Sequence, residues 1–140
     1  MADLSVLRRA VPGEGVAIEE SEAYLELTAA TKTLDGTHSG YLLLCTRPAD
    51  GSMVITLPAV STTYVGCRYR IVNASPDGTI TLSVTGATTE TIQGIGATTG
   101  QQVIHTKATS KYGDMIELSS GSATGWHIVR QIGTWAQAAD

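Results

Sequence analysis

Short runs in which apolar and polar residues alternate fill most of the chain. The clearest is TITLSVT at residues 79–85, in which isoleucine, leucine and valine alternate with hydroxyl side chains. A period of two residues is typical of a β-strand with one buried face, because successive side chains point to opposite sides of a sheet. The run predicts a strand with Ile80, Leu82 and Val84 in the core.

The run before it, CRYRIVN at residues 67–73, alternates in the same way. It predicts a strand with Cys67, Tyr69 and Ile71 inside and the two arginines outside. The sequence SPDG at residues 75–78 separates the two runs, and its Pro and Gly both favour a turn. We therefore expect the two strands to form a hairpin.

Similar runs recur along the chain, separated by Gly, Pro, Asp, Asn or Ser, and no window has a convincing helical period. Eight or nine short strands without a long linker predict an all-β fold: an antiparallel β-sandwich of jelly-roll type, or an irregular barrel. The pattern leaves the strand order open. The further expected strands are 24–28, 41–46, 53–57, 102–108, 114–119 and 126–132, with a weaker one at 90–93.

The first 23 residues differ from the rest in their pattern of apolar and polar residues and in their charge. The sequence PGEG at residues 12–15 interrupts any helix there. They hold five acidic and two basic side chains, a formal charge of −3 out of −4 for the chain. Their aliphatic residues have no evident partner within the segment. We expect a flexible N-terminal arm over residues 1–23, followed by a β-sandwich domain over residues 24–140.

Composition excludes several other classes of protein. The sequence has no basic patch of the kind that binds nucleic acid and no apolar run long enough to span a membrane. Its first residues lack a basic stretch followed by an apolar one, so we expect no secretory leader. Cys45 and Cys67 are the only cysteines and lack zinc-site spacing, so we expect two buried free thiols.

The histidines offer little for metal binding. His38, His105 and His127 lie far apart, with no pair at the spacing that places two imidazoles on one metal. Because His105 alternates with its two neighbours, we expect it to face solvent or a neighbouring subunit. We predict no metal site.

Carboxylates and glycines also suggest enzyme sites only superficially. Glu19, Glu20 and Glu22 resemble paired glycosidase carboxylates but fall in the arm, where a solvated run is the simpler interpretation. The glycine-rich GIGATTG at residues 94–100 precedes an expected strand rather than the helix that a phosphate loop requires. We therefore predict a protein with no catalytic residue and no cofactor.

Trp126 and Trp135 are the only tryptophans. An exposed Trp would provide a sugar-stacking surface, as in lectin-like domains. However, alternation places Trp126 on the same face as Ile128 and Ile132, which favours an anchor in the core or at a subunit interface.

Several segments together resemble the small β-domains of tailed-bacteriophage virion proteins, which occur in capsid decoration (cement) proteins, head fibres and tail fibres. The resemblance covers about residues 41 to 135. It rests on GSMVITLP at 51–58, VGCRYRIVN at 65–73, GTITLSV at 78–84, IQG at 92–94 and GW at 125–126.

This resemblance implies a structural protein of the virion rather than an enzyme. One domain and an arm are enough for a capsid decoration protein, which would be assembled in the host cytoplasm and stabilise the head from its outer surface. Its partners would be the major capsid protein and further copies of itself, most simply in a homotrimer, with no nucleic acid or membrane. The alternative is a receptor-binding or adhesive module of a head or tail fibre.

The arm is the expected capsid-docking segment, because its aliphatic side chains could be buried in a groove of the shell. The residues assigned to this docking are Leu4, Val6, Leu7, Arg8, Arg9, Val11, Val16 and Ile18.

Overall fold

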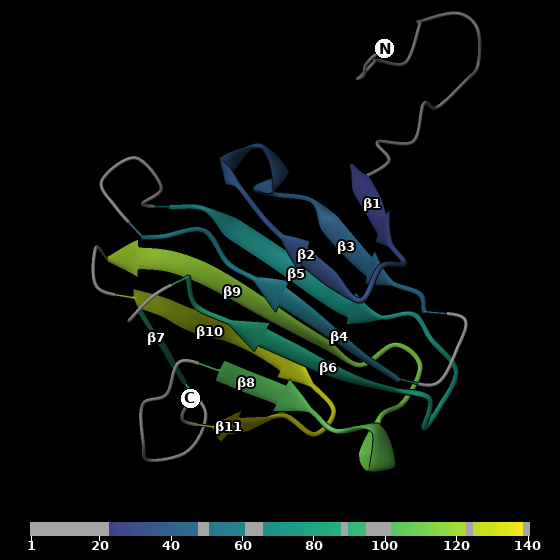
Figure 1. The fold of residues 1–140 in the computed structure, drawn as a ribbon. Coiled ribbons are helices and arrows are strands. Elements are labelled where there is room, and N and C mark those ends of the chain that lie inside the picture. The colour runs from purple at the N-terminus through teal and green to yellow at the C-terminus, as the bar shows by residue number, and fades with distance from the viewer. Residues whose placement is uncertain are drawn as a thin grey trace, which may run out of the picture.

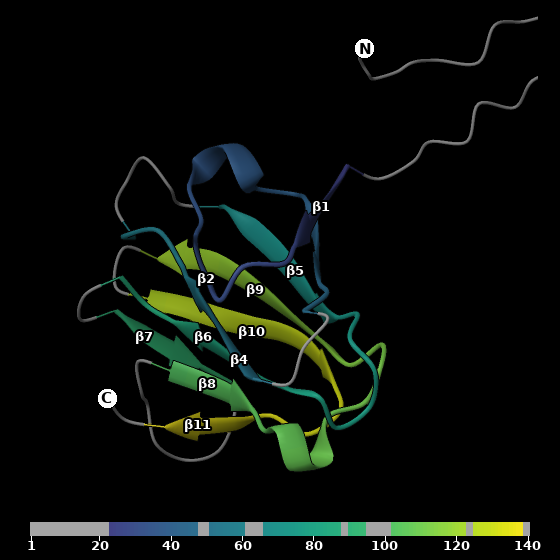
Figure 2. The ribbon, with the colours of Figure 1, turned by 45° about the vertical axis from the view of Figure 1, so that its right-hand side comes forward.

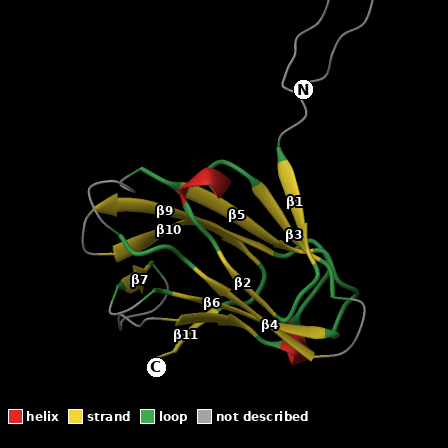
Figure 3. Ribbon diagram, turned by 45° about the horizontal axis from the view of Figure 1, so that its top comes forward, coloured by secondary structure: helices red, strands yellow, loops and turns green. Residues whose placement is uncertain are grey.

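The computed structural model describes residues 23–47, 51–60, 66–87, 90–94, 102–122 and 125–138 (Figure 1). Within these ranges, eleven strands form two sheets that pack face to face, and two short 3-10 helices lie in connections between strands (Figure 3). The all-β sandwich predicted from the alternating runs is therefore confirmed.

One sheet has six strands in the order β1-β3-β5-β9-β10-β7, and the other has five in the order β11-β8-β6-β4-β2. The strands of the six-stranded sheet are β1 (Tyr24–Leu27), β3 (Leu42–Cys45), β5 (Arg68–Asn73), β7 (Thr91–Gln93), β9 (Met115–Ser122) and β10 (Gly125–Ile132). The five-stranded sheet contains β2 (Thr31–Thr33), β4 (Gly51–Thr56), β6 (Ile80–Thr85), β8 (Gln102–His105) and β11 (Ala136–Ala138). The 3-10 helices are η1 (Gly36–His38) and η2 (Lys107–Thr109).

From β1 to β9 the chain alternates between the two sheets, so each strand and the next lie in opposite layers (Figure 2). In the first six strands, strands two apart in sequence run side by side in the same direction. This pattern makes β1, β3 and β5 parallel neighbours in one sheet and β2, β4 and β6 parallel neighbours in the other. Among the described strands, only β9 and β10 are both consecutive in the chain and paired with each other.

Two expectations about pairing are corrected by this arrangement. The sandwich is not purely antiparallel, because five of the nine described strand pairings are parallel. The strands β5 and β6 do not form a hairpin, since β5 pairs with β3 and β9 while β6 pairs with β4 and β8. The turn between them carries the chain from one sheet to the other. This alternation replaces the connectivity of a jelly roll.

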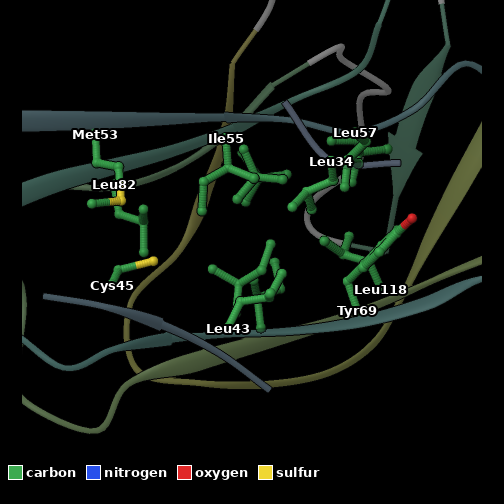
Figure 4. Close-up of a cluster of buried hydrophobic side chains, with 14 of the residues drawn as sticks. Leu34, Leu43, Cys45, Met53, Ile55, Leu57, Tyr69, Leu82 and Leu118 are labelled. Carbon is green, nitrogen blue, oxygen red and sulfur yellow. The ribbon is translucent and has the colours of Figure 1, made fainter. Parts of the chain in front are cut away.

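The core lies between the inner faces of the two sheets (Figure 4). Leu43 and Cys45 extend from the six-stranded sheet towards Met53 and Leu82 of the five-stranded sheet. The side chains of Ile80, Leu82 and Val84 are fully buried, as their alternation predicted.

The strand β10 contains a break in the alternation that the sequence does not reveal. Opposite β9, its register shifts between Ile128 and Arg130, so that Val129 is an extra residue. A bulge of this kind reverses which face the following side chains occupy. Ile132, expected on the same face as Trp126, therefore points outward and is 50% exposed.

Candidate interaction surfaces

The outer face of the six-stranded sheet carries a cluster of three arginines around one glutamate. Alternation turns Arg68 and Arg70 outward, as predicted, while Tyr69 between them is fully buried. The Nε atom of Arg68 lies 3.4 Å from one carboxylate oxygen of Glu117, and that of Arg130 lies 3.7 Å from the other. Arg70 and Arg130 are the cross-strand neighbours of Glu117. We call this surface the arginine face.

Burial differs sharply within this cluster. The side chain of Glu117 is 11% exposed, whereas those of Arg68 and Arg130 are each 59% exposed. The cluster itself holds three arginines and one carboxylate, and a second carboxylate, Glu26 of β1, is exposed on the same outer face in the row of Leu44. The alternation of residues 67–73 indicates two of these arginines but not Glu117 or Arg130, because only the register of β5, β9 and β10 brings them together.

An apolar row runs beside the arginines on the same face. The register aligns Leu44, Val72, Met115 and Ile132 across four strands. Ile132 and the bulged Val129 are each about half exposed, at 50% and 53%. The arginine face therefore combines positive charge with accessible aliphatic surface.

The outer face of the five-stranded sheet has a different chemistry. Its parallel strands align Thr33 with Thr56 and Thr85 in one row, and Thr31 with Val54 and Ser83 in the next. Within the described part of the chain, no charged side chain projects from this face. Its outward residues are Thr31, Thr33, Ser52, Val54, Thr56, Thr81, Ser83, Thr85, Gln102, Ile104 and Ala136. We call it the threonine face.

The expectation that His105 faces solvent or a subunit neighbour is wrong. His105 is fully buried, and its ring stacks on Trp135 at a centroid distance of 4.5 Å. Its Nδ1 atom lies 2.8 Å from the carbonyl oxygen of Thr134, and its Nε2 atom lies 3.2 Å from a carboxylate oxygen of Asp114. The strand β8 turns Val103 and His105 to the core, where the Thr134 carbonyl oxygen is the hydrogen-bonding partner of one ring nitrogen and the Asp114 carboxylate faces the other.

Both tryptophan side chains are buried in the protein interior. Trp126 is fully buried with its ring 5.5 Å from that of Tyr69. Trp135 is 4% exposed, and its indole N–H donates to the carbonyl oxygen of Ile132. Neither ring presents an open face, so the sugar-stacking alternative does not hold for these residues.

The other two histidines lie apart from His105. His38 belongs to η1, and its Nδ1 atom lies 3.1 Å from the Oδ1 atom of Asp35. His127 is exposed on the arginine face. Hydrogen bonds from the hydroxyl and the amide of Thr37 lower the pKa of Asp35. Within the described ranges, no three His, Cys, Asp or Glu residues gather in a way that could hold a metal ion.

The two cysteines are free thiols in different environments. Cys45 is buried, and loss of hydration raises the pKa of its thiol from 9.0 to about 12. Cys67 is half-buried rather than fully buried, because it lies just before β5 begins.

Several predicted features fall outside the described residues. They include Glu19, Glu20 and Glu22, most of the glycine-rich segment at 94–100, and the whole docking set: Leu4, Val6, Leu7, Arg8, Arg9, Val11, Val16 and Ile18. No helix in the described part of the chain is long and apolar enough to cross a membrane.

Comparison with known proteins finds no matching family model and no matching curated protein. The fold is a mixed, two-sheet β-sandwich in which the described residues give one outer face with an arginine–glutamate cluster and one outer face without charged side chains.

Proposed function

We propose that this protein is a bacteriophage capsid decoration protein that binds the outside of the head and stabilises it. The observation that carries the proposal is the difference between its two outer faces. An uncharged threonine face can pack against further copies of the chain without like-charge repulsion. The arginine face and the arm then remain for other contacts.

The mechanism is non-covalent stapling. A homotrimer contacts several capsid subunits at once, so that each additional contact is made at high effective concentration. Because the protein binds only the assembled shell, its binding free energy opposes separation of the subunits under the pressure of the packaged DNA.

The arm is the proposed capsid-docking segment. Its six aliphatic residues, at roughly 1.5 to 3 kcal/mol for each side chain fully buried, can outweigh the several kcal/mol lost on ordering the segment. The proposed docking residues are Leu4, Val6, Leu7, Arg8, Arg9, Val11, Val16 and Ile18.

The alternative, a receptor-binding module of a head or tail fibre, is less favoured. Glycan adhesion commonly uses aromatic rings that stack on sugars; the two tryptophans are 0% and 4% exposed, and the exposed aromatic rings among the described residues are those of Tyr24 and Tyr112, which lie on different parts of the chain. The uncharged face supports assembly more directly than it supports glycan recognition.

Binding of the purified full-length chain to heads that lack it tests the proposal. We expect saturable, stoichiometric binding in a fixed ratio to capsid subunits, and bound heads that retain their DNA at higher temperature. Electron microscopy should place the added mass on the outer surface of the head. Binding to host cells or glycans without binding to heads would instead establish the adhesive module.

A further inference from the structure

The imidazole of His105 is surrounded by three groups that each favour a positive charge on it. The first is the carbonyl oxygen of Thr134, which lies 2.8 Å from Nδ1. A carbonyl oxygen can only accept a hydrogen bond, so Nδ1 must carry a hydrogen. In a neutral ring the other nitrogen, Nε2, would then present a lone pair.

The second group is the carboxylate of Asp114. Its Oδ2 atom lies 3.2 Å from Nε2 of His105, and this contact is that of an ion pair rather than of an aligned hydrogen bond. The same Oδ2 atom accepts a hydrogen bond from the amide of Lys111, which favours an ionised carboxylate there. The side chain of Asp114 is only 9% exposed, so its charge needs a nearby cation, and a lone pair on Nε2 would repel it.

The third group is the indole ring of Trp135. It stacks on the imidazole of His105, with the ring centroids 4.5 Å apart and the ring planes inclined by 19°. The face of a tryptophan is the most favourable aromatic partner for a cation, and the attraction is stronger where water is excluded. Both side chains are buried in the protein interior.

We propose that His105 is a buried imidazolium ion paired with Asp114, and that its charge latches the C-terminal strand β11 onto the sandwich. Two of the three groups around the ring, Thr134 and Trp135, lie in the segment that leads from β10 to β11. The strand β11 is a three-residue edge strand, and among the described strands it pairs only with β8, which carries His105 (Figure 1). A strand this short has few ladder hydrogen bonds of its own, so the charged contact supplies much of its attachment.

The latch opens as the pH rises, because an imidazolium ion can lose its proton only in that direction. Asp114 is the charged group that faces the ring, and the turn before it holds Lys111, whose Nζ atom lies 3.7 Å from Asp77. The helix η2 adds Lys107, while β4, β6 and β11 have no ionisable side chain. Burial raises the pKa of the Cys45 thiol to about 12, so this core group stays neutral while the latch opens.

This device is a property of the free protein and does not rest on the proposed function. It connects a single proton in the core to the edge of the threonine face, because Ala136 of β11 lies on that face.

Nitrogen NMR of the full chain tests the charge. At about pH 7 the ring of His105 should show a directly bonded hydrogen on both nitrogens. Asp114→Asn removes the negative charge at nearly constant size and should leave the ring with one hydrogen. The matched control is Asp77→Asn, which alters an exposed carboxylate of the neighbouring turn and should leave both hydrogens in place. A parent spectrum with a hydrogen on only one ring nitrogen would overturn the proposal.

Amide hydrogen exchange tests the latch. In Asp114→Asn the amides of residues 136–138 should exchange about tenfold faster or more, whereas those of β5 in the other sheet should change by less than about twofold. Asp77→Asn should match the parent in both strands. Raising the pH until His105 loses its second hydrogen should lower the protection of β11 in the parent but not in Asp114→Asn.

Two results would overturn the latch: unchanged exchange in β11 of Asp114→Asn, or equal acceleration in β11 and β5, which would show that the ion pair stabilises the whole sandwich instead. Should Asp114→Asn fail to fold, the pH series of the parent gives the same comparison between the two strands.

Discussion

The carboxylate of Asp114 lies against Gly133, in the space that a Cβ atom of residue 133 would occupy. The same carboxylate accepts a hydrogen bond from the amide of Lys111 and faces the Nε2 atom of His105. Gly133 has a positive φ of 95°, which glycine adopts without strain. The glycine therefore makes room for a buried carboxylate that connects β8, β9 and the end of β10.

Replacement of this glycine should be unusually costly. Gly133→Ala places a methyl group on the carboxylate and strains the backbone, so we expect a loss of about 2–4 kcal/mol in the free energy of unfolding, measured by urea denaturation. Gly40→Ala is the matched control, because its φ is 85° and nothing lies within 4 Å of the added Cβ atom. We expect it to lose only the free energy of placing alanine at a positive φ, about 1 kcal/mol. Equal losses would show that the contact with Asp114 is unimportant.

The buried histidine should matter for stability rather than for activity. His105→Leu removes the hydrogen-bonding partner of the Thr134 carbonyl and leaves the buried Asp114 carboxylate facing an apolar side chain. We expect a loss of about 2–4 kcal/mol in the free energy of unfolding. The control His127→Leu, at an exposed position, should change it by about 0.5 kcal/mol or less. Similar effects for the two variants would contradict the buried network.

Cys45 should contribute to alkaline unfolding. The thiol stays protonated in the folded protein until about pH 12 but ionises near 9.0 once exposed. A raised folded pKa means that its contribution is fully present below pH 9 and is lost as the pH rises towards 12, with a slope of at most about 1.4 kcal/mol per pH unit. Denaturation series at pH 8 to 11 should show a shallower decline for Cys45→Ala than for the parent. Parallel declines would contradict the burial effect.

The threonine face is predicted to hold the oligomer together. Val54→Lys introduces a charge at the centre of that face, next to Thr31 and Ser83, and should convert a trimer into a 14.6 kDa monomer at micromolar concentration. Val72→Lys, an equally half-buried valine on the arginine face, is the control and should remain trimeric. Sedimentation velocity distinguishes the two. A parent protein that sediments as a monomer would refute the oligomer itself.

The arm should contribute to capsid affinity rather than to folding. Deleting residues 1–20 should leave the strands intact by circular dichroism and the oligomer intact by sedimentation. Affinity for undecorated heads should fall about tenfold or more, which corresponds to about 1.4 kcal/mol. Unchanged occupancy of heads by the truncated protein would show that the sandwich alone binds.

Local pattern was enough to determine the all-β fold class and which residues of the clearest strands are buried. The alternation in residues 79–85 identified a strand and its inward face, because the side-chain period of a strand is two whatever the partner strand is. The same rule placed Arg68 and Arg70 outside and Tyr69 inside.

Only the tertiary structure decided the pairing, and with it both outer surfaces. The SPDG turn marks where the chain bends but not whether it returns to the same sheet, since that choice depends on strands far away in sequence. The burial of His105 is accompanied by contacts to the Asp114 carboxylate and the Thr134 carbonyl, which the alternation of β8 does not reveal. The position of Ile132 followed from a bulge at Val129 that is defined only against β9. Periodicity is a local property, whereas register and partner choice arise from long-range packing, and the arginine and threonine faces exist only through the latter.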